Sequence, residues 1–254
     1  MGSAVLITGA SSGIGRATAL TVARSGTPVI AVARRHDRLE DLASDGELPI
    51  ECLVADVTEV GDRTRVFEAV GERPLAALVH GAGVFPRAPL REMSLEQWDA
   101  AMRTNVDARL WMTMGLAERL RGGRVLFVGS DAATTARHGG AAYSVSKAAS
   151  AMLWMCLGNE LGDEIAFAMA KPGLVETAML EGSLAADRER FGAGEVYAAM
   201  NDRGETISAE KVGAFFRWLL FDTPSEEFAR VWDIRDEEHH PAWLSGTLYS
   251  GASG

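Results

Sequence analysis

The chain has 254 residues, enough for one domain with a large buried core. Apolar residues make up 47% of it and charged residues 24%, which is ordinary for a globular protein. The net charge of −10 argues against nucleic acid as a partner, because no basic stripe could dominate the field of such a chain. No run of 18 apolar residues and no signal-peptide plan is present, so we expect a cytoplasmic protein without membrane contact.

Short aliphatic runs alternate with longer helical patterns along most of the chain. Several runs are apolar at every position, as expected of strands covered on both faces. The alternation predicts one α/β domain over residues 1–254, a Rossmann-type, doubly wound parallel sheet of about seven strands with helices on both faces. The expected strands are Ala4–Ile7, Pro28–Ala33, Ile50–Ala55, Leu75–His80, Arg124–Gly129, Ile165–Ala170 and Phe228–Ile234, and the clearest helices are Ser12–Ser25, Ser94–Leu120 and Ala141–Leu161.

A glycine-rich turn, TGASSGIG at residues 8–15, joins the first predicted strand to the first predicted helix. Gly9 allows a sharp turn, Gly13 lets backbone N–H groups approach a pyrophosphate, and Gly15 lets the helix pack closely on the strand. The helix dipole favours the same anion, although packing alone can also produce such a turn. We expect a dinucleotide cofactor to bind this loop, through Gly9, Ser11, Ser12, Gly13, Ile14 and Gly15.

The second predicted strand ends in Ala33 and is followed by Arg34 and Arg35. An NAD site usually places an acidic residue here for the ribose 2′-hydroxyl, whereas a guanidinium can pair with a 2′-phosphate. If Arg34 and Arg35 were only solvent-exposed residues at the start of a helix, the absence of an acidic residue at this position would be unexplained. The sequence therefore favours NADP(H) over NAD(H), with Arg34 as the first candidate and Arg35 as the second.

Two cysteines, Cys52 and Cys156, lie far apart with no metal-ligand spacing around them, and no metal site is expected. Both stand in apolar surroundings, which predicts buried free thiols rather than a disulfide.

Tyr143 and Lys147 lie four residues apart in a predicted helix, so their side chains share one face. An ammonium beside a phenol favours the phenolate, and we expect Lys147 to lower the pKa of Tyr143 from its ordinary value of about 10. A phenol tuned in this way can act as a general acid and base. Ser130 follows the fifth predicted strand, at the sheet edge where ligands bind, and could hydrogen-bond a substrate carbonyl.

These residues, in this order and spacing, resemble the short-chain dehydrogenase/reductase family over about residues 4–177. The turn matches T-G-x-x-x-G-x-G, and the further matches are Asp56-Val57, Asn105, Ser130, Tyr143 with Lys147, and Pro172-Gly173 with Thr177. The resemblance implies hydride transfer between a nicotinamide and a ketone, an aldehyde or a secondary alcohol, with Tyr143 as the acid or base.

The same resemblance implies roles around the cofactor. Asp56 and Val57 would contact the adenine, and Lys147 would also hold the nicotinamide ribose. Asn105 would expose its backbone carbonyl in a helix kink and hold a water that relays protons to Lys147. Small residues would form the floor under the cofactor and flank its carboxamide, namely Gly81, Ala82 and Gly83, then Pro172, Gly173, Val175 and Thr177.

His80 replaces the asparagine that relatives carry before these glycines, and we expect a structural imidazole there. Segment 179–206 is small, charged and weakly periodic, which predicts a helical flap over the substrate. The expected pocket walls are Phe85, Asp131, His138, Met179, Leu180 and Leu184. Asp131 could orient a polar substrate or cap the loop that follows it. The tail after Asp236 should cover the last strand, but no role follows for His138, His239 or His240.

The predicted helix 141–161 has an apolar surface too wide for one buried stripe, at Met152, Leu153, Met155, Cys156 and Leu157. Pairing of this helix in a homodimer or homotetramer would account for the width of its apolar surface. Burial of the same residues in the core of a single chain is the alternative. The segments 208–212 and 228–233 are faintly similar to sepiapterin- and benzil-reductase-like members, which act on vicinal dicarbonyls. Two other possibilities are a non-catalytic NADPH-binding regulator, disfavoured by the complete catalytic set, and a sugar-nucleotide epimerase, disfavoured by the short C-terminal part.

Overall fold

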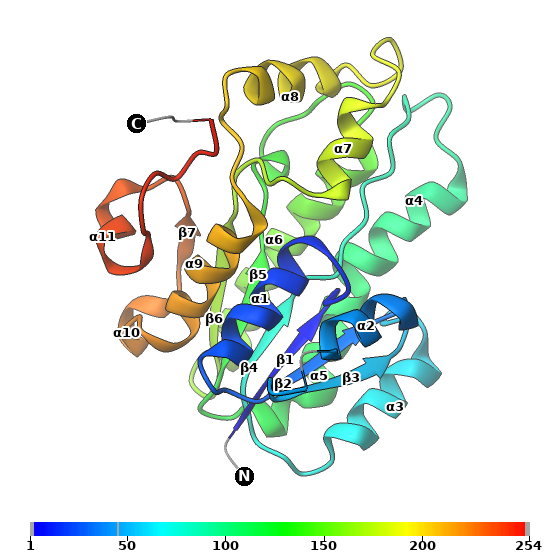
Figure 1. Ribbon diagram of the computed structural model, residues 1–254. Coiled ribbons are helices and arrows are strands. Elements are labelled where there is room, and N and C mark those ends of the chain that lie inside the picture. The colour runs from blue at the N-terminus through cyan, green and yellow to red at the C-terminus, as the bar shows by residue number, and fades with distance from the viewer. Residues whose placement is uncertain (1–2, 45, 252–254) are drawn as a thin grey trace.

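The computed structural model describes residues 3–44 and 46–251. Its centre is a sheet of seven parallel strands in the order β3-β2-β1-β4-β5-β6-β7 (Figure 1). The order reverses between β1 and β4, and doubly wound sheets bind ligands at such a reversal. The strands are β1 (Ala4–Thr8), β2 (Val29–Ala33), β3 (Ile50–Val54), β4 (Leu75–His80), β5 (Arg124–Val128), β6 (Ala166–Lys171) and β7 (Val231–Asp233). The predicted Rossmann-type fold is confirmed.

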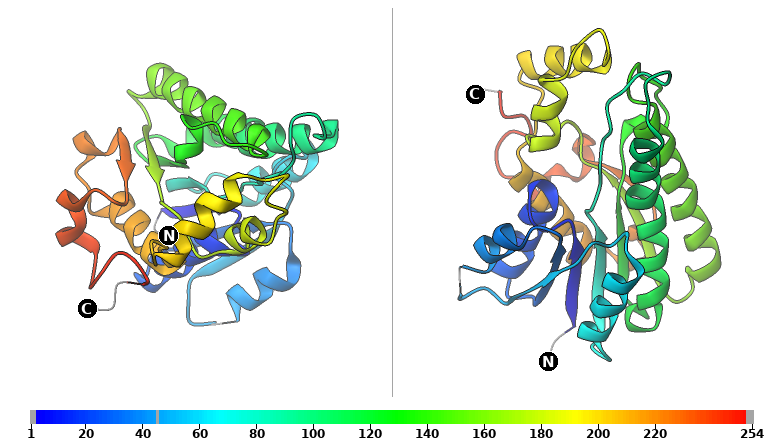
Figure 2. Two further views of the ribbon diagram at one scale, coloured as in Figure 1. Left: turned by 90° about the horizontal axis from the view of Figure 1, so that it is seen from above. Right: turned by 90° about the vertical axis from the view of Figure 1, so that its right-hand side faces the viewer.

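Helices cover both faces of the sheet (Figure 2), and each layer has its own core. On one face lie α1 (Gly13–Arg24), α2 (His36–Ala43) and α9 (Ala209–Phe221), and on the other α3 (Val60–Val70), α5 (Ala108–Leu116) and α6 (Ala141–Leu161). The central strands β1 and β2 are buried at every position, because they are apolar on both faces. Within the described residues, no helix is long and apolar enough to cross a membrane.

The predicted helix 94–120 is interrupted in the structure. Ser94 opens α4 (Leu95–Met102) with a capping box, in which its hydroxyl accepts from the Gln97 N–H and the Gln97 side chain accepts from the Ser94 N–H. A π-helical segment, Arg103–Asp107, then separates α4 from α5, and a 3₁₀ turn, Ala117–Leu120, follows α5. The expected helical stretch is thus interrupted at Asn105, where the family resemblance implies a helix kink, and such π segments often mark functional sites.

Two further predictions from the sequence are wrong in detail. The last strand is Val231–Asp233, because Phe228 instead ends the short helix α10 (Ser225–Phe228), where its ring is fully buried. Cys156 is exposed rather than buried, and Cys52 is half-buried, although both are free thiols as predicted. The other six strands agree with prediction to within one residue at each end.

Two helices, α7 (Ala178–Leu184) and α8 (Ala193–Asp202), stand above the carboxyl ends of the strands (Figure 1), where the sequence predicts a flap. The tail after β7 forms the short helix α11 (His240–Trp243). Its neighbour His239 lies among the rings of Phe215, Trp218, Trp232 and Trp243. The Trp243 indole donates to His239 Nδ1 (2.8 Å), so His239 Nε2 donates to the Asp233 carbonyl (2.9 Å). The tail thereby fixes the chain that follows β7.

Candidate active site

A continuous groove runs along the carboxyl ends of the strands. It consists of two adjoining cavities whose linings share Ile14, Gly81, Ala82, Gly83, Thr177 and Met179. One cavity reaches the loop before α1 and the end of β2, and the other reaches Tyr143. All residues that the sequence assigns to cofactor binding line one cavity or the other, namely Gly9, Ser11, Ser12, Gly13, Ile14, Gly15, Arg34, Arg35, Asp56, Val57, Gly81, Ala82, Gly83, Tyr143, Lys147, Pro172, Gly173, Val175 and Thr177.

The loop before α1 is built to hold an anion. Gly9 has φ +70°, and a Cβ there would lie 2.6 Å from the Ala82 backbone nitrogen, so only glycine permits this turn against the neighbouring loop. Ser12 opens α1 in an extended conformation without a side-chain cap, which leaves first-turn N–H groups facing the groove. Unpartnered N–H groups and the helix dipole together suit a phosphate.

The two arginines after β2 have different partners. Arg35 donates to Ser11 Oγ (2.9 Å) and Ser12 Oγ (2.6 Å), which places its guanidinium over the phosphate-binding loop. The Arg34 side chain is two-thirds exposed and lies 3.5 Å from the Asp56 carboxylate. Burial alone would raise the pKa of Asp56, but hydrogen bonds from Thr58 and the charge of Arg34 hold it below its ordinary value. This end of the groove therefore carries two guanidinium groups. In the part of the chain that the structure describes, that of Arg34 lies beside a carboxylate and that of Arg35 lies beside two serine hydroxyls.

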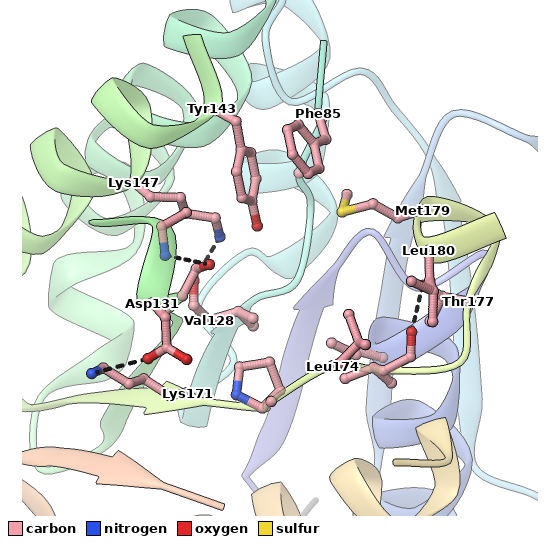
Figure 3. A pocket seen from close by; sticks show the side chains of 18 of the residues that line it. Phe85, Val128, Asp131, Tyr143, Lys147, Lys171, Leu174, Thr177, Met179 and Leu180 are labelled. Carbon is pink, nitrogen blue, oxygen red and sulfur yellow. Dashed lines mark hydrogen bonds and ion pairs between the residues drawn. The ribbon is translucent and has the colours of Figure 1, made fainter. Parts of the chain in front are cut away.

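At the other end, the Tyr143 hydroxyl points into the second cavity, between Lys147 and the α7 residue Met179 (Figure 3). Ser130 lines the same cavity, and its hydroxyl caps a 3₁₀ turn by accepting from the Ala132 N–H (3.1 Å). Lys147 Nζ donates to the Val128 carbonyl (2.9 Å) at the end of β5. The structure thus brings the predicted phenol, amine and hydroxyl to one place.

The pKa of Tyr143 differs from the expectation. Burial raises the pKa of Tyr143 to about 12, and the groups that lower it are Ser130, Arg109 and Arg87 rather than Lys147. Lys147 is itself 95% buried, and burial together with the charge of Arg109 holds its pKa well below the ordinary value. The sequence predicts that Lys147, together with the positive nicotinamide of an oxidised cofactor, lowers the pKa of Tyr143, whereas Lys147 is not among the groups that lower it in this structure.

Asn105 lies behind the cavity rather than in its lining, fully buried in the π-helical segment. Its side-chain amide donates to the Val84 carbonyl (2.9 Å) and to Ser146 Oγ (2.9 Å), and its Oδ1 accepts from the Val84 N–H (3.0 Å). These bonds connect the loop after β4 to helix α6, which carries Tyr143. The side chain is a brace, and its backbone role stays a prediction.

Comparison with known proteins agrees with this geometry. The family model described as short chain dehydrogenase matches residues 3–188, well over half of the chain. The chain belongs to the short chain dehydrogenase family. It is accordingly an oxidoreductase that acts on alcohol or ketone groups.

Three relatives illustrate the range of the family. A 2,3-dihydro-2,3-dihydroxybenzoate dehydrogenase of Bacillus subtilis is 34% identical over 70% of this chain and 72% of that protein. A putative NAD(P)-dependent gluconate 5-dehydrogenase from Beutenbergia cavernae, solved with bound NADP, is 30% identical with a TM-score of 0.81, over 92% of this chain and 95% of that one. Actinorhodin polyketide ketoreductase, solved with NADPH, is 25% identical with a TM-score of 0.78, over 91% and 95%.

The substrate wall of this short chain dehydrogenase is only partly as predicted. Phe85, Asp131, Met179 and Leu180 line the cavity, whereas His138 and Leu184 do not. Phe85 stacks on Tyr143 with 4.0 Å between ring centroids. Four further residues line the cavity without belonging to any motif of the sequence, because they come from separate elements of the fold, namely Arg137, Lys171, Tyr197 and Arg235.

Asp131 does not cap the loop that follows it, since Ser130 does so. Its carboxylate instead pairs with Arg235 (2.9 Å) and Lys171 (3.4 Å) at the cavity edge. Burial would raise the pKa of Asp131, but these two cations hold it below the ordinary value. Arg235 also bonds Asp233, so the tail beyond β7 contributes to the wall.

His80 is a structural imidazole, as expected. It is 2% exposed, its Nε2 lies 2.9 Å from the Thr113 hydroxyl, and Phe127 packs against the ring at 4.7 Å. Burial and the charge of Arg109 hold the pKa of His80 well below its ordinary value of 6.5, so the ring stays neutral.

Proposed function

We propose that this chain is an NADP(H)-dependent oxidoreductase that transfers hydride between the nicotinamide and a ketone, an aldehyde or a secondary alcohol, with Tyr143 as the general acid or base. The observation that carries the proposal is the placement of the Tyr143 hydroxyl in a cavity continuous with an anion-binding loop. A phenol in that position can exchange a proton with an oxygen at the same place where a hydride reaches carbon.

The residues present fit the cofactor. The glycine loop and the α1 N-terminus would hold the pyrophosphate, Asp56 and Val57 would contact the adenine, and Gly173 and its neighbours would flank the carboxamide. When bound, the nicotinamide supplies or accepts the hydride. Two solved relatives carry NADP or NADPH, which supports the same cofactor here.

The preference for NADP(H) rests on Arg35 and Arg34. Arg35 is held by two serine hydroxyls of the phosphate-binding loop, while Arg34 is extended toward solvent. A 2′-phosphate between them would receive charge-assisted hydrogen bonds from both. We therefore assign Arg35 the preorganised contact and Arg34 the mobile one, which reverses the order expected from sequence.

In the reducing direction, Ser130 would donate to the substrate carbonyl oxygen and Tyr143 would give that oxygen its proton. The phenolate left behind needs a nearby cation and a proton supply. Lys147, at the Val128 carbonyl, lies beside the phenol ring, with Nζ 5.4 Å from the ring centroid. Asn105 in the π segment would present its backbone carbonyl to the water of this relay. In oxidation Tyr143 would act as the base.

The substrate is a small molecule that fits under α7 and α8. Phe85, Met179 and Leu180 offer it an apolar wall and the Asp131–Arg235 pair a polar edge. Secondary alcohols, simple ketones and vicinal dicarbonyls of the sepiapterin or benzil kind all match this lining. We further propose that segment 179–206 opens as a flap and that α6 pairs with a second copy in a homodimer or homotetramer.

The test is to screen the purified protein with NADPH, and with NADH, against diketones, ketones, aldehydes and quinones, following consumption of the reduced cofactor. The proposal expects oxidation of NADPH that requires one of these carbonyl substrates. Tight NADPH binding without turnover over the whole panel would instead indicate a regulator that senses the cofactor.

A further inference from the structure

The wall of the substrate cavity carries more positive than negative charge, although the chain as a whole has a net charge of −10. Two of the lining cations, Lys147 and Arg109, are buried and both bond the Val128 carbonyl. The other three come from separate elements of the fold, namely Arg137, Lys171 and Arg235. Asp131 is the one carboxylate in the described part of the lining. The wall therefore calls for an explanation of its excess positive charge.

Arg235 and Lys171 are already paired with carboxylates. Arg235 bonds Asp131 (2.9 and 3.1 Å) and Asp233 (2.6 and 2.8 Å), which together occupy most of its N–H groups. Lys171 Nζ lies 3.4 Å from the same Asp131 carboxylate (Figure 3). These two cations and two carboxylates balance one another, so the charge in excess is that of Arg137.

Arg137 has no such partner. It lies half-buried in the loop between β5 and α6 and lines the same cavity as Tyr143. Within residues 3–44 and 46–251, no carboxylate lies within ion-pair distance of its guanidinium. The guanidinium carbon lies 5.8 Å from the ring centroid of Tyr197, on α8 of the proposed flap. Contact with an aromatic ring neutralises no charge, so Arg137 still lacks an anion.

A neutral substrate would leave this charge uncompensated. A substrate held under α7 and α8 takes the guanidinium further out of water, and a cation that loses its hydration without gaining a counterion is costly. A carboxylate restores the balance, because a guanidinium pairs with it through two parallel hydrogen bonds. A phosphate monoester carries about two negative charges at neutral pH, which is more than the single excess charge of the wall.

We propose that the substrate of this site carries a carboxylate, which Arg137 binds while the reacting carbonyl lies at Tyr143. Lys171 and Arg235 neutralise Asp131, so that its carboxylate does not repel the substrate. This inference rests on the proposed function and names its substrate class, which is an oxo acid in reduction and a hydroxy acid in oxidation.

The carboxylate takes no part in the chemical step. In reduction the carbonyl carbon receives hydride from NADPH, the carbonyl oxygen receives the proton of Tyr143, and the phenol regains a proton from water. The products are the hydroxy acid and NADP⁺. Arg137 is thus a specificity-determining residue, which acts on substrate binding and orientation.

The test compares oxo acids with their methyl esters, which keep the carbonyl and lose the charge. The pairs are benzoylformate, levulinate and acetylbenzoate, each with its ester, because they place the carboxylate at different distances from the carbonyl. Each compound is assayed with NADPH on the unchanged protein, Arg137→Gln, Arg137→Lys and the control Arg91→Gln. Arg91 is an exposed arginine of the loop between β4 and α4, outside the cavity lining.

At least one acid should exceed its ester in kcat/KM by about tenfold or more in the unchanged protein. Arg137→Gln should abolish this ratio by lowering kcat/KM for the acid and not for the ester. Arg137→Lys should keep part of the ratio, and Arg91→Gln should keep all of it. Esters reduced as well as the acids by the unchanged protein, which needs no variant to fold, would overturn the proposal. An acid preference that survives Arg137→Gln would also overturn it, as would a higher kcat/KM for glycerone phosphate than for every acid.

Binding measurements separate this inference from the proposed function. The same acids and esters are titrated calorimetrically into the unchanged protein and Arg137→Gln, with and without NADP⁺. Tighter binding of an acid to the unchanged protein, with no turnover of any compound, would support the carboxylate site and contradict the proposed oxidoreduction. Turnover of ketones or esters without any preference for acids would support the oxidoreduction and contradict the carboxylate site. Absence of both acid binding and turnover would contradict both.

Discussion

At the scale of single residues, the site is defined by groups whose protonation the fold controls. Tyr143, Lys147 and His80 are all buried, and each is held toward its uncharged form. This setting would suit the proposed carbonyl reduction, because a neutral phenol is a proton donor and a dry cavity strengthens every remaining charge.

His80 makes stability depend on pH. Because its pKa is lowered in the folded protein, the unfolded chain binds the proton first, and the stabilisation present above pH 6.5 is lost as the pH falls below that value. We expect the free energy of unfolding to fall by up to about 1.4 kcal/mol per pH unit there from His80. When the free energy of unfolding is measured by denaturant titration at several pH values below 6.5, it should fall less steeply with decreasing pH for His80→Asn than for the unchanged protein. An unchanged slope would mean that the imidazole is not held neutral.

The proposed preference for NADP(H) also rests on single side chains. Arg35→Asp should reverse the preference for NADPH over NADH, since it removes the preorganised guanidinium and places a carboxylate where the 2′-phosphate would bind. Arg34→Asp should weaken the preference by a smaller factor. The ratio of kcat/KM for the two cofactors measures both effects. A preference that survives both substitutions would show that the 2′-phosphate is not recognised here.

At the scale of elements, the main feature is a set of contacts that links Tyr143 to helix α7, in the segment proposed to act as a flap. Arg87 donates to Ser183 Oγ (2.9 and 3.0 Å) and to the Met179 carbonyl (2.5 Å), and its guanidinium lies 4.9 Å from the Phe85 ring centroid. Phe85 in turn stacks on Tyr143. A chain of contacts therefore runs from α7 to Tyr143, the proposed proton donor.

Removing this connection should loosen the flap. Arg87→Ala deletes hydrogen bonds worth about 1 kcal/mol each, so residues 178–202 should open at least about tenfold more often and KM for the substrate should rise. Hydrogen exchange of α7 and α8 measures the opening directly. Arg91→Ala, at an exposed arginine of the same loop between β4 and α4, is the matched control and should change neither quantity. Equal exchange in both variants would show that Arg87 does not hold the flap.

At the scale of the whole molecule, helices α5 and α6 expose large apolar side chains to solvent. Trp111, Met114, Met152 and Met155 are each about half-exposed on α5 and α6, which lie in the same helical layer. Exposed apolar patches of this kind mark protein interfaces. The patch fits the predicted pairing of α6 between two copies of the chain.

A charge on this patch should separate the copies. Met155→Glu should convert a dimer or tetramer into smaller species in analytical ultracentrifugation, because a carboxylate buried between apolar helices has no partner. Val60→Glu, at a still more exposed apolar position at the start of α3, should leave the assembly intact. A monomeric unchanged protein, or an assembly unaffected by Met155→Glu, would contradict the pairing.

Much of this molecule follows from its sequence, for physical reasons. Strands that are apolar on both faces and a glycine turn leave few alternatives, which is why β1–β6 and the groove residues are found as expected. Periodicity alone does not predict the π segment, and the bonds that its Asn105 makes to Val84 and Ser146 join residues far apart in the sequence. Arg109 and the Asp131–Arg235 pair are also missed, because their partners are distant in sequence and only the fold brings them together.

The central claim is that the Tyr143 hydroxyl gives a proton to the oxygen of a carbonyl that receives hydride from NADPH. The most direct measurement uses NADPH deuterated at the transferable position, a ketone that the protein reduces, and Tyr143→Phe beside the unchanged protein. The account predicts deuterium on the carbinol carbon for the unchanged protein, and for Tyr143→Phe similar NADPH affinity with turnover lower by at least about a hundredfold. Turnover by Tyr143→Phe close to that of the unchanged protein, or an alcohol without deuterium, would contradict it.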